Sequence, residues 1–141
     1  MTLEFEAVGA APFEEIVELY KSAGWWQDAP EGDMEARAVI SAMIRGSFRF
    51  MIARLPEGRI IGMARVISDG CSDAYIQDVV VLPSYRKQGI GRELIRLLTE
   101  FCVARKISWI GLIAEPGTRK FYEELGYGPL AGYQPMLYGK R

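Results

Sequence analysis

Two glycines and three cationic side chains crowd one short segment of this chain: Arg86, Lys87, Gly89, Gly91 and Arg92. The apolar segment before them (74–82) is typical of a buried strand, and the segment after them has the apolar spacing of a helix. The first amides of a helix have no partner within it, and the helix dipole adds positive charge there. Glycine lets the backbone approach a ligand closely. The segment therefore predicts an anion site, which we interpret as a cradle for the phosphates of a cofactor.

Two familiar phosphate-binding motifs do not fit this turn. A P-loop requires Gly-Lys-Ser/Thr, which does not follow Gly91. The dinucleotide fingerprint requires a third glycine where this chain has Leu94. What stands at 86–91 is Arg-x-x-Gly-x-Gly. A plain tight turn explains one glycine, but it explains two glycines among three cations less well.

Length and composition narrow the class of protein. The 141 residues predict a single domain, 1–141. The chain has 17 Lys and Arg against 18 Asp and Glu, a net charge of −1, which argues against a nucleic-acid or membrane partner. No apolar run reaches the roughly 18 residues of a membrane span, and 1–15 do not resemble a signal peptide. We therefore expect a cytoplasmic protein.

Cysteine and histidine usage limits the chemistry. Cys71 and Cys102 are far apart and form no disulfide framework, which suits a reducing compartment. The chain has no histidine, so Ser-His-Asp and Cys-His mechanisms are excluded and the commonest metal ligand is missing. The cysteines also lack the spacing of a zinc site. We expect no metal.

The periodicity of the remaining chain predicts the elements that position the turn. Strands are expected at 2–8, 48–55, 59–67, 74–82, 107–113 and 133–138, the last at a sheet edge because it contains Pro135. Helices are expected after Pro12, from Asp33 to Gly46, after Gly89 and after Thr118. The order is β-α-α-β-β-β-α-β-α-β. It predicts an α/β fold, a mixed sheet with helices on both faces.

Two motifs resemble those of a known family. Asp-Val-Val-Val-Leu-Pro-Ser-Tyr-Arg-Lys-Gln-Gly-Ile-Gly occupies 78–91, and Phe-Tyr-Glu-Glu-Leu-Gly-Tyr occupies 121–127. Together they resemble the GNAT superfamily of acyl-CoA-dependent N-acetyltransferases, whose element order matches the one predicted here over nearly the whole chain. The resemblance implies a mostly antiparallel, twisted sheet. It also implies transfer of an acetyl group from acetyl-CoA to the primary amine of a small molecule, by direct attack in a ternary complex.

The resemblance also assigns residues to acetyl-CoA. Amides around 88–92 would bind the pyrophosphate, and backbone groups of Val79 and Val81 would pair with the pantetheine arm as an added strand does. The amide of Val79 or Val80 would face the thioester carbonyl. The implied cofactor-binding set is Val79, Val80, Val81, Arg86, Lys87, Gln88, Gly89, Ile90, Gly91 and Arg92.

For catalysis, the resemblance implies that the phenol of Tyr122 protonates the departing sulfur; otherwise Tyr122 only packs the short helix. The base is open. Gln77 stands where many relatives have glutamate, and an amide cannot accept the proton. Asp78 points to the opposite strand face unless a bulge intervenes. Asp78 acting through water, a purely structural Asp78, and deprotonation by bulk water are the alternatives.

The family builds its acceptor site from the first helices, their connecting loop and the C-terminal strand. Those segments offer Tyr20, Trp25, Trp26, Asp28, Tyr133 and Tyr138. We expect at most one of the two tryptophans to face the acceptor. An aromatic wall with a carboxylate favours a cationic or aromatic amine. Arg65 would instead hold an acidic acceptor, or be solvated at the strand end.

Other functions remain open from the sequence. A non-catalytic acyl-CoA-binding regulatory module would keep the fold without turnover. Gln77, at a position where many relatives have glutamate, is consistent with this alternative. A protein-lysine acetyltransferase would need an open groove lined by acidic groups. An edge strand at 133–138 also suggests a homodimer.

Overall fold

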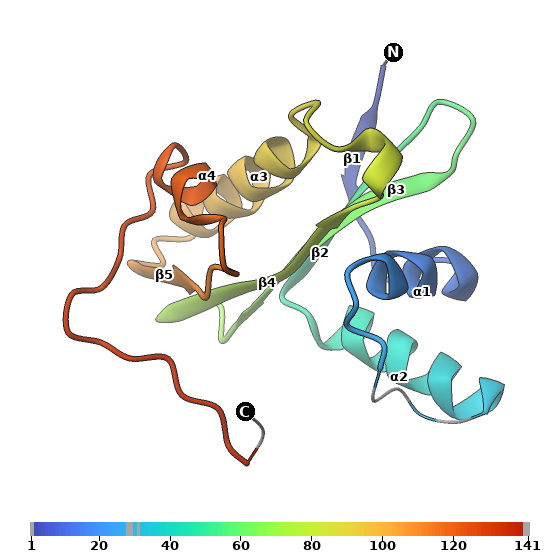
Figure 1. Ribbon diagram of the computed structural model, residues 1–141, viewed down its shortest axis with the longest axis horizontal. Coiled ribbons are helices and arrows are strands. Elements are labelled where there is room, and N and C mark those ends of the chain that lie inside the picture. Colours follow the sequence, from blue (N-terminus) through green and yellow to red (C-terminus); the bar gives the residue numbers. More distant parts are fainter. Residues whose placement is uncertain (1, 28–29, 31, 140–141) are drawn as a thin grey trace.

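Across residues 2–27, 30 and 32–139, which the computed structural model describes, five strands form one sheet in the order β1-β2-β3-β4-β5. Neighbours are antiparallel from β1 to β4, whereas β5 runs parallel to β4. This is the mixed, mostly antiparallel sheet expected (Figure 1). The bounds of its strands are β1 (Glu4–Ala7), β2 (Arg49–Arg54), β3 (Ile60–Ser68), β4 (Asp73–Val81) and β5 (Trp109–Leu112).

Helices cover both faces of the sheet (Figure 1). On one face lie α1 (Phe13–Ser22) and α2 (Asp33–Gly46), with α1 against β3 and β4. On the other face α3 (Ile90–Ala104) packs against β2, β3 and β4, and the short α4 (Arg119–Glu123) lies beyond it. None of the helices in the described part of the chain has the length and apolar character needed to cross a membrane.

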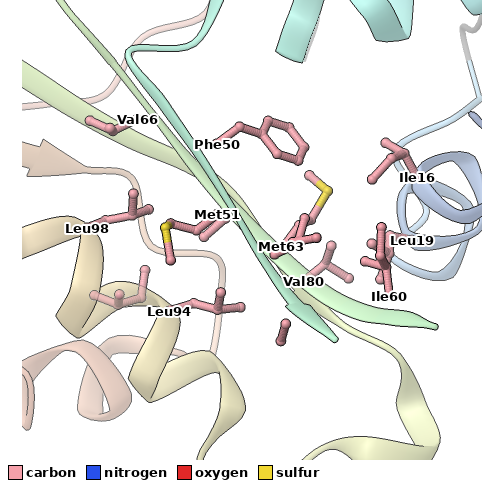
Figure 2. Packing of buried hydrophobic residues seen from close by; sticks show 14 of the residues in the cluster. Ile16, Leu19, Phe50, Met51, Ile60, Met63, Val66, Val80, Leu94 and Leu98 are labelled. Atoms are coloured by element: carbon pink, nitrogen blue, oxygen red, sulfur yellow. The ribbon is translucent and has the colours of Figure 1, made fainter. Parts of the chain in front are cut away.

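The core has two layers, one on each side of the sheet. Figure 2 shows Leu94 and Leu98 of α3 on one side of the strands and Ile16 and Leu19 of α1 on the other, all fully buried. Because strand side chains alternate, β2 sends Phe50 and Met51 to opposite layers. The helix expected after Gly89 is confirmed as α3. Its buried stripe consists of Ile90, Leu94, Ile95, Leu98 and Cys102, and Phe101 is half-buried.

The strand expected at 133–138 is wrong. From Gly128 to Gly139 the chain forms no helix or strand and is exposed throughout, and it leaves the body of the molecule after α4 (Figure 1). Pro129 and Pro135 carry no amide hydrogen for a ladder. Gly132 has a left-handed conformation (φ 81°) where the chain turns, with the Tyr133 amide 3.1 Å from the Leu130 carbonyl oxygen. An isolated strand without a neighbour is not stable, and β5 is therefore the edge of the sheet.

Candidate active site

A pocket opens where β4 and β5 separate. The two strands pair from Asp73 opposite Trp109 to Ile76 opposite Leu112, after which β4 continues to Val81 and β5 ends. The pocket at this fork has a volume of about 330 Å³. It is lined by Trp25, Tyr75, Ile76, Gln77, Asp78, Val79, Leu112, Ile113, Glu115, Thr118 and Tyr122. Its walls thus come from β4, β5, α4 and the two loops that follow α1 and β5.

A β-bulge brings Gln77 and Asp78 to the same pocket. In the β3–β4 ladder Met63 faces Val80 but Arg65 faces Gln77, so Asp78 and Val79 lie opposite Ala64 alone. Asp78 takes a left-handed backbone conformation, with φ 57°. Such a conformation is costly for most residues but is tolerated by Asp. The bulge removes the alternation that would have put the two side chains on opposite faces.

The carboxylate of Asp78 is held by two side chains. Its Oδ2 accepts a hydrogen bond from the Tyr20 hydroxyl (2.7 Å) and one from Arg65 Nε (2.8 Å), whereas Oδ1 accepts none from the described residues. Arg65 Nη1 also donates to Ser47 Oγ at 3.3 Å. Only 11% of the Arg65 side chain is exposed, so it is not solvated at the strand end. Its guanidinium binds the carboxylate of Asp78, and Arg65 does not line the pocket.

Tyr122 lies on α4 and lines the pocket. Its ring is half-buried against Phe121 and Tyr127, with centroids 4.9 Å and 6.3 Å away. Burial, followed by the charge of Glu115, raises the pKa of the Tyr122 phenol above its ordinary value. The phenol therefore remains a proton donor at neutral pH.

A hydrogen bond joins two residues that line the pocket. Trp25 Nε1, after α1, donates to Glu115 Oε1, after β5, at 3.0 Å. Glu115 was not among the residues proposed from the sequence. In the sequence, Glu115 is marked only by its position just before Pro116, Gly117 and α4. The path of β5 brings it beside Trp25. Thr118 and Ile113 were missed for the same reason.

The other proposed acceptor residues lie elsewhere. Trp26 packs beside Tyr20, with ring centroids 5.9 Å apart, and does not line the pocket. Of the two tryptophans, Trp25 lines the pocket. Asp28 lies outside the described residues. Tyr133 is 68% exposed in the C-terminal segment and is not part of the pocket.

The turn before α3 presents backbone rather than side chains. Lys87 (φ 61°) and Gly89 (φ 82°) both have left-handed conformations, a geometry that turns successive amides toward one side. No side chain caps the start of α3. Residues 86–89 are exposed, whereas the Ile90 and Val80 side chains belong to the core. This leaves the amides at the start of α3 for an anion.

Two of the cations expected at this turn have other partners. Arg86 Nε donates to the Val81 carbonyl oxygen at 2.9 Å, and Arg92 Nη2 forms an ion pair with Glu124 Oε2 at 2.7 Å. Both arginines are exposed. Gly91 has room for a Cβ, whose nearest contact would be Phe121 at 3.6 Å.

The pocket and the turn fit an elongated ligand such as acetyl-CoA. Both belong to one stretch of chain, because 75–79 line the pocket and β4 then leads through Val81 to the turn. Since β5 stops pairing at Ile76, the backbone of 77–81 is not covered by β5. An open strand edge next to uncapped helix amides suits a ligand with amides at one end and phosphates at the other.

Known proteins are similar to this chain in sequence and in fold. The model of the "Acetyltransferase (GNAT) family" matches residues 13–127. The chain is 41% identical over 71 residues to GCN5-related N-acetyltransferase 2, chloroplastic, of Arabidopsis thaliana, a match covering 50% of this chain and 28% of that relative. The chain thus spans less than a third of that relative's length.

Solved structures agree along the whole chain. A GNAT family protein of Streptococcus pneumoniae superposes with a TM-score of 0.80 at 22% identity, covering 99% of each chain. AAC(6')-Iy, in complex with the bisubstrate analogue CoA-S-monomethyl-acetylneamine, superposes with a TM-score of 0.73 at 19% identity, covering 100% of this chain and 99% of that one. These likenesses establish the fold, and the family model covers most of the sequence. The chain belongs to the acetyltransferase (GNAT) family.

Proposed function

We propose that this protein transfers an acetyl group from acetyl-CoA to the primary amine of a small cationic molecule. The observation that carries the proposal is the pocket at the β4–β5 fork. It holds the carboxylates of Asp78 and Glu115, the phenol of Tyr122 and the ring of Trp25, and no Lys or Arg is among its described lining residues. Anionic and aromatic groups together favour a cation.

Acetyl-CoA would be held mainly by backbone groups. The amides of Gln88, Gly89, Ile90 and Gly91 would bind the pyrophosphate, with Lys87 adding charge. Backbone groups of Val79 and Val81 would pair with the pantetheine amides, which requires Arg86 to release the Val81 carbonyl oxygen. When bound, acetyl-CoA supplies the thioester that the amine attacks.

Three groups would manage charge and protons during the transfer. The amide of Val79 or Val80 would donate to the thioester oxygen as negative charge develops there. Tyr122 would give its proton to the departing sulfur. Oδ1 of Asp78, which accepts no hydrogen bond from the described residues, would accept the amine proton through water, while Oδ2 stays with Tyr20 and Arg65.

A second candidate has an observation in its favour. Gln77 lines the pocket and cannot act as a base, and Arg65 neutralises Asp78. A pocket whose two carboxylates, Asp78 and Glu115, both already accept hydrogen bonds from protein side chains suits an acyl-CoA-binding regulatory module that does not turn over. A protein-lysine acetyltransferase has less support, because it would need a groove lined by acidic groups, whereas Trp25, Tyr75 and Tyr122 also line this pocket.

The test is release of free CoA thiol from acetyl-CoA with a panel of amines: polyamines, arylalkylamines, amino sugars and a lysine-containing peptide. We expect turnover with a cationic small amine, and a fall in kcat of about 10²- to 10⁴-fold in Tyr122→Phe. Tyr127→Phe is the matched control, because Tyr127 is half-buried beside Tyr122 but bonds Thr99 and lies outside the pocket.

Three outcomes would contradict the proposal in different ways. Acetyl-CoA that raises the melting temperature without turnover of any amine would favour the regulatory module. Acetylation of the peptide alone would favour the protein-lysine acetyltransferase. If saturating acetyl-CoA leaves the melting temperature unchanged, although ~100 times Kd should add roughly 2.7 kcal/mol, the cofactor assignment fails.

A further inference from the structure

A second hollow crosses β3, β4 and β5 beside the candidate active site. In the two ladders Tyr75 stands opposite Ile67 of β3 and Gly111 of β5. Asp73 stands opposite Trp109. Residues paired in this way project from the same face of a sheet, so they border one trough. The trough has a volume of about 350 Å³ and is lined by Ile67, Asp73, Ala74, Tyr75, Trp109, Gly111, Leu112 and Leu130.

The trough is mostly apolar and carries one charge. Ile67, Trp109 and Leu130 are 42%, 49% and 54% exposed, so its apolar walls are open to solvent. Asp73 is the only charged residue among the described residues that line it. Its carboxylate accepts no hydrogen bond from the described residues, because Ser68 Oγ donates to the backbone carbonyl oxygen of Asp73 instead. An unpaired carboxylate beside an indole ring is a favourable place for a cation.

The trough adjoins the pocket of the candidate active site. Tyr75 and Leu112 line both of them. Gly111, opposite Tyr75, has no side chain, and a Cβ built there would meet the Trp109 indole nitrogen at 3.9 Å, an ordinary contact. The surface over Gly111 is therefore low, and a chain-like ligand can pass over it from the pocket toward Asp73.

Tyr75 supplies a neutral hydroxyl at this junction. Burial, followed by the charge of Asp78, raises the pKa of the Tyr75 phenol above its ordinary value. The phenol therefore keeps its proton at neutral pH and can both donate and accept a hydrogen bond. The carboxylates of Asp78 and Glu115 belong to the pocket, and that of Asp73 belongs to the trough. Negative charge thus stands at both ends of a path whose middle is uncharged.

We propose that the trough binds the far end of the acceptor, and that the acceptor is a linear amine with a second positive charge. Asp73 precedes Gln77 and Asp78 by four and five residues along β4, which corresponds to about 13–16 Å in an extended strand. The second cation would lie between the Asp73 carboxylate and the Trp109 indole, at about that distance from the reacting nitrogen. This inference rests on the proposed function, because it extends the acceptor of the same site.

The first experiment compares kcat/KM for three amines by release of CoA thiol. Spermine carries cations along its whole length, decylamine is of similar length with one cation, and putrescine is too short to span the path. We expect spermine to exceed decylamine by about fivefold or more, as for a partly exposed charge pair. Asp73→Asn keeps the shape of the side chain and should remove this preference. Glu57→Gln, exposed in the β2–β3 turn outside both hollows, should retain it.

The second experiment blocks the path with Gly111→Val. Gly111 lies in β5 without a left-handed φ, and valine suits a strand, so the circular dichroism spectrum should be unchanged. We expect KM to rise more for spermine than for putrescine, because only the longer amine passes over Gly111. Gly9→Val is the matched control. Gly9 also has no left-handed φ, has open space where a Cβ would stand and lies outside both hollows, so both KM values should stay the same.

A calorimetric titration of spermine in the presence of CoA separates this inference from the proposed function, because it measures binding without turnover. Spermine binding that is lost in Asp73→Asn, with no amine acetylated, would support the trough while refuting the proposed transfer. Equal kcat/KM for spermine and decylamine, or spermine binding that Asp73→Asn leaves unchanged, would overturn the second-cation site and leave the acetyl transfer standing.

Discussion

Arg65 stands opposite Gln77 in the β3–β4 ladder, yet its Nε donates to the next residue, Asp78, at 2.8 Å from Oδ2. The bulge in β4 makes this contact, because it turns the Asp78 side chain back toward β3. Asp78 lines the pocket, and the pair is mostly buried, with 11% of the Arg65 side chain and 22% of the Asp78 side chain exposed. The bulge in β4 thus determines the position of the Asp78 carboxylate, the candidate base.

Arg65→Met should lower the free energy of unfolding by about 2 kcal/mol, measured by urea denaturation. The substitution leaves the Asp78 carboxylate without its charged partner in a poorly solvated position. Arg59→Met is the control. Its pair with Glu18 is about half exposed on both sides, and such pairs are worth at most about 1 kcal/mol. Equal losses in the two variants would show that the Arg65–Asp78 pair does not stabilise the fold.

Tyr20 should make the free energy of unfolding depend on pH in the alkaline range. Burial, and then the charge of Asp78, raise the pKa of Tyr20 above its ordinary value near 10. In the unfolded chain the phenol loses its proton at about pH 10, whereas in the folded chain it keeps it, so the free energy of unfolding falls as pH rises above about 10. The contribution of Tyr20 to the free energy of unfolding is fully present below that pH.

Tyr20→Phe separates this effect from other titrations. At neutral pH the variant should be less stable by about 1 kcal/mol, because the hydrogen bond to Asp78 is lost. The difference in unfolding free energy between the two proteins should narrow as the pH is raised above 10. Tyr133→Phe, at an exposed position, should show the same pH dependence of the free energy of unfolding as the unmodified protein. A constant difference for Tyr20→Phe would refute the assigned linkage.

Gly89→Ala tests the turn before α3. Gly89 has φ 82° and open space where a Cβ would stand, so alanine costs about 1 kcal/mol of backbone strain and places a methyl group over the amides. We expect the melting-temperature rise with acetyl-CoA to shrink markedly. Gly58→Ala carries similar strain (φ 109°, open space) in the β2–β3 turn and should leave the rise intact. The same reduction in both variants would argue against phosphate binding at this turn.

Glu115→Gln tests the charge of the pocket. The glutamine oxygen can still accept the hydrogen bond of Trp25 Nε1, so the wall is kept and only the charge is removed. KM for a cationic amine should rise roughly fivefold, as expected for a partly exposed charge, with kcat little changed. Glu123→Gln, exposed on α4 outside the pocket, is the control. An unchanged KM would mean that Glu115 does not attract the acceptor.

Much of the fold follows from local sequence. The apolar spacing after Gly89 predicted α3, whose buried residues include Ile90, Leu94 and Leu98, and Gly89 stands at its N-cap with a left-handed conformation. The pairing of the 78–91 and 121–127 motifs predicted the family, which the family model confirms. Local signals sufficed here because helix periodicity and turn conformation are decided within a few residues.

The strand expected at 133–138 shows where such signals fail. Its apolar residues have strand-like composition, but a strand exists only when another segment supplies its hydrogen bonds. No neighbouring segment of the described chain does so.

By itself, the sequence predicted the helices, the successive strands β2 and β3, the glycine turn before α3 and the short helix that carries Tyr122, all of which depend on neighbours along the chain. Only the tertiary structure decided that a bulge turns Asp78 toward Arg65 and Tyr20, that Trp25 meets Glu115 across 90 residues, and that the C-terminal segment leaves β5 bare. Each of these depends on strand register or on contacts between distant segments. Since register is set by the packing of the whole sheet, it cannot be read from any one segment.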